Sequence, residues 1–389
     1  MLSKRIKQLK PSPTISLDAK VKELQAKGIP VINLGLGEPD FATPKVIGEA
    51  GIDAINNGFT HYTAAAGIPE LKNAIANDLQ KESNVVYKSD EIIVGVGSKA
   101  ILYNIFQTLC DRGDEVIVAT PTWSTYLEQI KLAEGTPVTI QLEPPFKLTA
   151  EAVAKKITKK TKIILLNSPC NPTGAVIERE ELEKIAALAV KHKIYVISDE
   201  IYDKLRYSKT PYISIASLGE EIKKYTIIVN GFSKTYAMTG WRVGYAAGPK
   251  EIISALTALQ GQITSNTSSI GQKAAVAALK YGQEEAQKMH AEFSARREHL
   301  IREFGNIKEL SFTAPEGAFY FFVSIKNLLN DVYPSSSEWC TGLLEAEHVA
   351  VVPGEAFEAP GFFRMSFAAS MPDLDKGVEG IKRFIKKLK

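Results

Sequence analysis

Short hydrophobic runs alternate with longer amphipathic stretches from about residue 45 to residue 285. The short runs are rich in valine and isoleucine, as buried strands are, whereas stretches such as Arg179–Lys191 repeat their apolar residues with the period of a helix. This alternation predicts an α/β fold with a mainly parallel central sheet and helices on both faces. The clearest predicted strands, each followed by helical periodicity, are Glu91–Gly95, Glu115–Ala119, Lys162–Leu166, Ile194–Ser198 and Thr226–Val229.

The pattern changes after residue 285, because one long periodic stretch, Gln283–Phe304, predicts a helix that leads into a smaller α/β domain. The predicted strands of this domain are Gly317–Val323, Val349–Val352 and Phe363–Phe367. A chain of 389 residues exceeds one ordinary core, which agrees with two domains. We expect an N-terminal segment at 1–44 that packs on the small domain, a large domain at 45–285 and the small C-terminal domain at 286–389.

Composition argues against several kinds of protein. The net charge of +3 is small for this length and gives no indication of nucleic-acid binding. Cys110, Cys170 and Cys340 lack the spacing of metal ligands and predict reduced thiols in a cytoplasmic protein. The N-terminal sequence has no apolar signal core, and no apolar run reaches the length of a membrane span. We therefore expect no metal site, no nucleic-acid partner and no membrane partner.

Each of the five predicted strands of the large domain runs into a polar cluster at its carboxyl end. The clusters are Gly97–Lys99, Pro121–Trp123, Asn167–Gly174, Asp199–Tyr202 and Ser233–Lys234. In open α/β sheets, ligands bind outside the carboxyl ends of the strands. We therefore expect the five clusters to converge on one crevice.

The residue types in these clusters suit one cofactor. Lys234, followed by Arg242, suits a site that binds a carbonyl and a phosphate together. Gly97 opens a predicted helix, whose N-terminal N–H groups favour an anion. Asp199 follows an apolar strand, where a carboxylate needs a partner such as a protonated ring nitrogen. Pyridoxal phosphate carries a carbonyl, a phosphate and a ring nitrogen, and so suits all of these residues. Each residue alone also has an ordinary structural explanation.

Four longer motifs strengthen this interpretation. They are S-K-x-x-A-M-x-G-W-R at 233–242, N-x-P-x-N-P-T-G at 167–174, S-D-E-x-Y at 198–202 and F-R-x-S-F at 363–367. Together they resemble the class I aminotransferases, which belong to the fold-type I pyridoxal-phosphate enzymes. The resemblance extends over nearly the whole chain, from the loop Gly37–Phe41 onward. One departure is Gly231, because many relatives carry a hydroxyl residue three positions before the lysine.

The resemblance implies a cofactor-binding role for most of these polar residues. Lys234 would attach the cofactor and move the proton, Asp199 would pair with the ring nitrogen, and Arg242 would pair with the phosphate. Tyr202 and Asn171 would hydrogen-bond the phenolic oxygen. The other implied cofactor residues are Gly97, Ser98, Lys99 and Ser233 near the phosphate, Trp123 over the ring, and Tyr62 at the phosphate of the neighbouring subunit. The expected protein is thus a homodimer with shared active sites.

The resemblance also implies how substrate binds. Arg364 would pair with the α-carboxylate of an L-amino acid, and the backbone of Gly37 would reach the same group; Trp123 and Asn171 would complete this site. Lys99 resembles the lysine that binds the distal carboxylate in the Iβ subgroup of aspartate aminotransferases, which the segment Lys10–Thr14 also fits. We therefore expect a ping-pong transfer of an amino group from aspartate to 2-oxoglutarate.

Other functions stay open at this point. Prephenate, aromatic or kynurenine aminotransferases share most of these residues, and a pyridoxal-phosphate lyase or decarboxylase is a further alternative. A nicotinamide-dependent dehydrogenase is disfavoured, because no strand ends in G-x-G-x-x-G with an acidic residue about twenty positions later. A catalytically silent relative would be expected to lack Lys234, Asp199 or Arg242, and all three are present.

Overall fold

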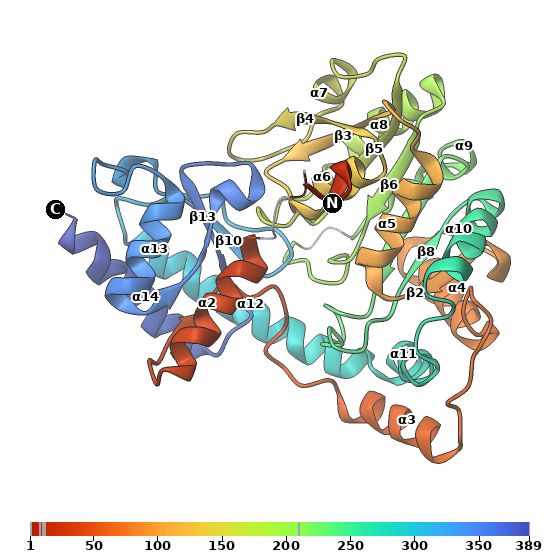
Figure 1. Ribbon diagram of the computed structural model, residues 1–389, viewed down its shortest axis with the longest axis horizontal. Coiled ribbons are helices and arrows are strands. Elements are labelled where there is room, and N and C mark those ends of the chain that lie inside the picture. The colour runs from red at the N-terminus through yellow and green to blue at the C-terminus, as the bar shows by residue number, and fades with distance from the viewer. Residues whose placement is uncertain (1, 8, 10–12, 209–210, 389) are drawn as a thin grey trace.

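The computed structural model describes residues 2–7, 9, 13–208 and 211–388. Its largest sheet has seven strands in the order β2-β8-β7-β6-β5-β3-β4 (Figure 1). The bounds are β2 Ile92–Gly95, β3 Glu115–Thr120, β4 Thr136–Gln141, β5 Thr161–Asn167, β6 Tyr195–Asp199, β7 Thr226–Gly231 and β8 Gly244–Ala247. The pairs from β7 to β4 are parallel, and β8 runs antiparallel to both β7 and β2. All strands except β8 therefore end at the same edge.

Helices cover both faces of this sheet, which explains why its inner strands contain continuous apolar runs, whereas the edge strand β4 is more polar and more exposed. Side chains of α5 (Gly97–Leu109), α6 (Thr125–Leu132) and α10 (Lys250–Ile263) pack on one face. Those of α7 (Ala150–Ala154), α8 (Arg179–His192) and α9 (Glu220–Lys223) pack on the other. The predicted layered α/β architecture is confirmed.

The five strands predicted in this sheet are confirmed, as is the predicted helix at α8. The expectation of a helix after every strand is wrong for β7, which leads through turns directly to β8. Ala237 and Arg242 in this connection have positive φ angles of 50° and 54°. Such left-handed positions interrupt a right-handed helix. The connection is therefore a loop that holds its side chains at fixed points along the sheet edge.

A second, antiparallel sheet has the order β12-β13-β10-β9 and lies beside the large one (Figure 1). Its strands are β9 Ser311–Phe312, β10 Tyr320–Ser324, β12 Val352–Pro353 and β13 Phe362–Ser366. It is flanked by α12 Gln283–Gly305, α13 Ser336–Glu347 and α14 Met371–Lys387. The predicted strand Val349–Val352 is divided, because β11 (Val349–Ala350) pairs instead with β1 (Ile32–Asn33).

The beginning of the chain packs on this second sheet. In addition to the parallel pairing of β1 with β11, helix α2 (Pro13–Ala26) contacts β12. These contacts support the division that we propose, in which 1–44 and 286–389 form one unit and 45–285 the other. The remaining helices are α1 Lys4–Lys7, α3 Lys45–Asn56, α4 Pro69–Ser83 and α11 Ser269–Tyr281, with 3₁₀ helices at Ser89–Glu91, Ile215–Leu218, Lys326–Leu328 and Gly354–Phe357.

Two further expectations from the sequence concern the segment Lys10–Thr14 and membrane-spanning helices. Residues 10–12 of the segment Lys10–Thr14 lie outside the described residues. Among the helices of the described ranges, none combines the length and the apolar character needed to span a membrane.

Candidate active site

A cavity of about 380 Å³ lies at the carboxyl edge of the large sheet, between it and the second sheet. All five predicted polar clusters contribute to it. The cluster residues in its wall are Ser98, Lys99, Trp123, Asn167, Asn171, Asp199, Ile201, Tyr202, Ser233 and Lys234. Leu36, Gly37 and Glu38 close it from the N-terminal segment, and Tyr320 and Arg364 from the second sheet. The expected convergence on one crevice is confirmed.

Asp199 is the last residue of β6 and is only 2% exposed. Its Oδ2 accepts a hydrogen bond of 2.5 Å from the hydroxyl of Tyr126 on α6, and its Oδ1 accepts one of 3.2 Å from the backbone N–H of Ile201. Burial raises the pKa of Asp199 to about 6, against the effect of these two donors. The carboxyl group is thus held in place and gains from a cationic partner inside the cavity.

Lys234 follows β7 and points its amine into the cavity, where Nζ donates a hydrogen bond to the carbonyl of Gly37. Burial lowers the pKa of Lys234 to about 8; nearby Glu38 raises it, and Arg364 and other cations lower it further. An amine with such a pKa exchanges its proton readily near neutral pH. The position and the titration of Lys234 therefore suit both nucleophilic attack and proton transfer.

Arg242 and the first turn of α5 form an anion cradle. A Cβ at Gly97, which has a φ of 76°, would lie 2.6 Å from Nη2 of Arg242, so only glycine lets the guanidinium come this close to the helix. The first N–H groups of α5 have no partners within the helix. Together with the arginine, they favour a group such as phosphate. Ser98 also lines the cavity, and its hydroxyl donates to the carbonyl of Asn230 at 2.9 Å.

Arg364 lies on β13, opposite this cradle, and is 2% exposed. Its Nη1 donates to Oδ1 of Asn171 at 2.9 Å, and its Nη2 donates to the carbonyl of Gly35 at 2.8 Å. Its Nε is buried and has no hydrogen-bond partner among the described residues. Both of its partners are neutral oxygens, so the buried charge lacks a counter-ion. Asn171 is thereby placed beside Arg364, in agreement with a shared role at the substrate.

Lys99 and Trp123 form another wall of the cavity. Nζ of Lys99 lies 4.7 Å from the centre of the Trp123 ring, a cation–π contact. Burial and, to a smaller extent, Arg242 lower the pKa of Lys99. Trp123 in turn packs edge-on against Tyr126, with 5.3 Å between the ring centres. The amine is therefore held partly out of water, where an anion gains most from it.

The other predicted residues fall into two groups. Tyr202 and Ser233 lie in the cavity wall and are buried, as is expected for residues that touch a ligand there. Tyr62 is 90% exposed and does not line the cavity of its own chain. Within its own chain Tyr62 thus makes no contact with this cavity, and the predicted contact would have to come from a second copy of the chain.

The cavity wall carries more cationic than anionic side chains, because its carboxylates are those of Glu38 and Asp199. Lys99, Lys234, Arg242 and Arg364 all line it, and within the described ranges none of them forms an ion pair. Other buried cations of the described ranges do have such a partner, as Arg296 does in Asp40 at 2.7 Å. Arg364 is buried and Lys234 is half-buried, and a cation that is kept from water without a counter-ion indicates that the missing anion belongs to a ligand.

Comparison with known proteins agrees with this geometry. The family model for aminotransferase class I and II matches residues 29–381. The chain belongs to the class I and II aminotransferases. It is 44% identical to the aspartate aminotransferase of Bacillus sp. (strain YM-2), over 99% of both chains. It is also 45% identical to the probable aspartate/prephenate aminotransferase of Aquifex aeolicus (strain VF5), over 100% of this chain and 99% of the relative.

A solved structure agrees as well. The aspartate aminotransferase from Thermus thermophilus with maleate is 38% identical, covers 99% of both chains and gives a TM-score of 0.94. The predicted fold and the predicted aminotransferase activity are thus confirmed.

The structure of this aminotransferase also reveals cavity residues that the sequence did not indicate. Tyr126, Tyr320, Glu38 and Thr239 line the cavity but lie outside the residues predicted to act there. Glu38 accepts a hydrogen bond of 2.7 Å from the Thr239 hydroxyl, which joins the N-terminal segment to the loop of Lys234. Asn167 also lines the cavity, and its place in the motif at 167–174 could have identified it as a site residue. Tyr126 and Tyr320 lie in no motif that would have done so.

Proposed function

We propose that this protein is a pyridoxal-phosphate-dependent aminotransferase that exchanges an amino group between L-aspartate and 2-oxoglutarate by a ping-pong cycle. The observation that carries the proposal is the set of four cations around one cavity without carboxylate partners among the described residues. A cofactor phosphate and a dicarboxylic substrate together supply the anions that this set lacks.

The residues present fit the cofactor. Arg242 and the N-terminus of α5 would hold the phosphate, and Gly97 leaves them the room to converge. Asp199 would pair with the ring nitrogen, because it is buried, kept in position by Tyr126 and raised in pKa. Tyr202 and Asn171 would reach the phenolic oxygen, and Trp123 would cover the ring. Ser98, Ser233 and Lys99 complete the cofactor site that we propose.

When bound, pyridoxal phosphate supplies the carbonyl that accepts the amino group and a ring that withdraws electrons from the substrate. Lys234 would hold the cofactor and would take and return the proton at Nζ, which its pKa of about 8 permits near neutral pH. Arg364 would orient the substrate through its α-carboxylate, and the backbone of Gly37, which lines the same cavity, would reach the same group.

Lys99 supports aspartate as the substrate. Its amine lies in the cavity wall on the ring of Trp123, whereas Arg364 contacts Asn171 and Gly35, so that each of the two cations could take one carboxylate. The names of the relatives from Bacillus and Thermus thermophilus agree with this choice. Prephenate is a second candidate, because the relative from Aquifex aeolicus carries both names and Trp123 offers an aromatic surface beside Lys99.

We further propose a cytoplasmic homodimer. Cys110, Cys170 and Cys340 are free thiols, which suits a reducing compartment. The exposed Tyr62 would reach the cofactor phosphate of the partner subunit.

The test uses the purified, cofactor-loaded protein, to which L-aspartate, L-glutamate, L-alanine, L-phenylalanine or L-kynurenine is added separately. The measured quantity is the rate at which the visible absorbance of the bound cofactor disappears. We expect aspartate and glutamate to act fastest. Preferential reaction with an aromatic donor would overturn the proposed specificity, and the absence of any visible band would overturn the cofactor.

A further inference from the structure

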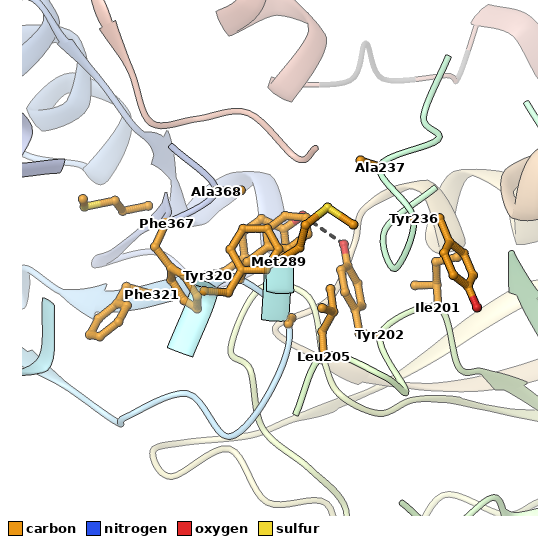
Figure 2. Close-up of a cluster of buried hydrophobic side chains, with 14 of the residues drawn as sticks. Ile201, Tyr202, Leu205, Tyr236, Ala237, Met289, Tyr320, Phe321, Phe367 and Ala368 are labelled. Atoms are coloured by element: carbon orange, nitrogen blue, oxygen red, sulfur yellow. Dashed lines mark hydrogen bonds between the residues drawn. The ribbon is translucent and has the colours of Figure 1, made fainter. Parts of the chain in front are cut away.

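Tyr320 lies at the point where the two sheets meet across the cavity. It begins β10, pairs with Ser366 of β13 and is 1% exposed. Figure 2 shows its ring among the buried side chains, and the dashed line marks the hydrogen bond between its hydroxyl and that of Tyr202. The two hydroxyl oxygens are 2.9 Å apart. A residue of the second sheet thus touches a residue of the loop that follows Asp199.

The ring of Tyr320 has a separate contact with Arg364. The centre of the guanidinium lies 4.2 Å from the ring centre of Tyr320 and 4.9 Å from that of Phe357. A planar guanidinium stacks well on aromatic rings, which restrict its rotation and compensate part of the cost of burial. The hydrogen bonds to Asn171 and Gly35 leave Nε without a partner among the described residues. The two rings therefore help to keep the guanidinium at the angle at which it can meet a carboxylate.

The hydroxyl of Tyr320 is also closely surrounded. A Cβ at Gly37 would lie 3.2 Å from it, and the carbonyl of Gly37 accepts a hydrogen bond from Lys234. Tyr202 is 4% exposed, and burial together with the nearby Tyr320 raises its pKa, so it stays protonated. Each of the two tyrosines has one hydroxyl proton. If Tyr202 donates its proton to a group in the cavity, the hydrogen bond between the two hydroxyls uses the proton of Tyr320, so that Tyr320 donates and Tyr202 accepts. Such a chain polarises its members and makes Tyr202 a stronger donor.

We propose that Tyr320 is a positioning residue that couples the substrate-binding arginine to the tyrosine at the cofactor: its ring fixes Arg364, and its hydroxyl strengthens the hydrogen bond that Tyr202 donates to the phenolic oxygen. This inference rests on the proposed function. It assigns two separable tasks to one side chain, because the ring and the hydroxyl contact different partners.

The two tasks can be tested with two variants of the full-length, cofactor-loaded protein. Tyr320→Phe keeps the ring and removes the hydroxyl, whereas Tyr320→Leu removes both. One measurement is the dissociation constant of maleate, a dicarboxylate probe. The other is the pH at the midpoint of the change in visible absorbance of the bound cofactor. Tyr207→Phe is the matched control, because the hydroxyl of Tyr207 donates to the carbonyl of Ala318 and does not line the cavity.

We expect Tyr320→Phe to bind maleate within about twofold of the wild type. Its midpoint should move upward by about 0.5 pH unit or more, since a weaker donor at Tyr202 leaves more negative charge on the phenolic oxygen, which favours the protonated form. Tyr320→Leu should move the midpoint as well and weaken maleate binding about tenfold. Tyr207→Phe should change neither quantity.

An unchanged midpoint in Tyr320→Phe would overturn the coupling to Tyr202. Because this variant retains the ring that packs in the core, its result does not depend on whether Tyr320→Leu folds. Equal loss of maleate binding in Tyr320→Phe and Tyr320→Leu would overturn the role of the ring. A wild-type protein without a cofactor band or without maleate binding would instead contradict the proposed function itself.

Discussion

Two lysines line the cavity, and burial lowers the pKa of both, yet their surroundings prepare them for different tasks. Lys234 sits at the sheet edge against the carbonyl of Gly37, where a proton can be exchanged. Lys99 sits in the first turn of α5, against the ring of Trp123. The helix dipole disfavours a cation in that turn, so the position is unfavourable unless an anion compensates it. This cost supports a binding role for Lys99.

We therefore predict that Lys99→Gln slows the reaction with aspartate at least about tenfold, because a charge-assisted hydrogen bond to the distal carboxylate is lost. The reaction with alanine, which has no distal carboxylate, should change little. The measurement is the rate of loss of the cofactor absorbance with each donor. Lys191→Gln, at an exposed position in the last turn of α8, is a control for the loss of one positive charge. Equal slowing with both amino acids would contradict the assignment.

Glu200 is a buried acid next to Asp199 that takes no part in the proposed chemistry. It is 0% exposed, and its Oε1 accepts hydrogen bonds from Ser198 at 2.9 Å and from Ser214 at 2.6 Å. Burial raises its pKa from 4.5 to about 8. The folded protein thus keeps a proton that the unfolded chain releases. Its contribution to stability is fully present below pH 4.5 and is lost as the pH rises through 8, by about 1.4 kcal/mol per pH unit at most.

Glu200→Gln should remove this dependence. We predict that the melting temperature of the variant falls less than that of the wild type between pH 5 and pH 8, as followed by circular dichroism. Glu180→Gln, at an exposed position in the first turn of α8, should behave like the wild type. Parallel curves for Glu200→Gln and wild type would show that Glu200 titrates alike in the folded and unfolded chain.

At the scale of elements, the phosphate cradle depends on how closely β8 approaches α5. A Cβ at Gly244, the first residue of β8, would lie 2.4 Å from the backbone nitrogen of Ser98. A Cβ at Gly231, at the end of β7, would lie 2.8 Å from the Ser98 hydroxyl. Glycine at 231 therefore leaves room for Ser98, whose hydroxyl binds the carbonyl of Asn230. The space that a side chain at position 231 would need is thus taken by the Ser98 hydroxyl, which gives a steric reason for the glycine.

We predict that Gly244→Ala displaces the first turn of α5 and weakens pyridoxal-phosphate binding at least about tenfold, because several charge-assisted hydrogen bonds lose their geometry together. The dissociation constant is measured by titrating the cofactor-free protein and following the visible absorbance. Gly261→Ala in α10 is the matched control, because a Cβ there meets nothing within 4 Å. Unchanged cofactor affinity in Gly244→Ala would contradict a cradle built on this contact.

The same elements explain what the sequence could and could not predict. β5 and β6 are uninterrupted apolar runs followed by motifs, so both the strands and their polar ends were evident. β8 was not, because Gly-Tyr-Ala-Ala has little strand propensity. Tyr126 was missed for a different reason. Its bond to Asp199 joins residues 73 positions apart and exists only once α6 packs on the sheet, a tertiary contact that leaves no local pattern.

At the scale of the whole molecule, the homodimer that we propose would place a second copy of the chain beside the cavity. A wide groove of about 890 Å³ adjoins it and shares Glu38, Thr239 and Arg242 with it. Asn266 lies in the wall of this groove and accepts a hydrogen bond from the backbone of Thr63, the neighbour of the exposed Tyr62. The loop of Tyr62 therefore borders the groove of its own chain. A two-fold axis near this border would bring the partner's loop to Arg242.

Mixed dimers test whether Tyr62 acts across such an axis. Lys234→Ala should be inactive as a homodimer, and Tyr62→Ala should be impaired about tenfold or more, since a hydrogen bond to the phosphate is lost. A heterodimer of the two variants, isolated with two affinity tags, combines both changes in one site and leaves the other site intact if Tyr62 serves its partner. We then expect roughly half of the wild-type activity per dimer. If Tyr62 served its own chain, one site would carry Lys234→Ala and the other Tyr62→Ala, and the activity would be about one twentieth of the wild type or less. The recovery itself therefore decides between a shared and a self-contained active site.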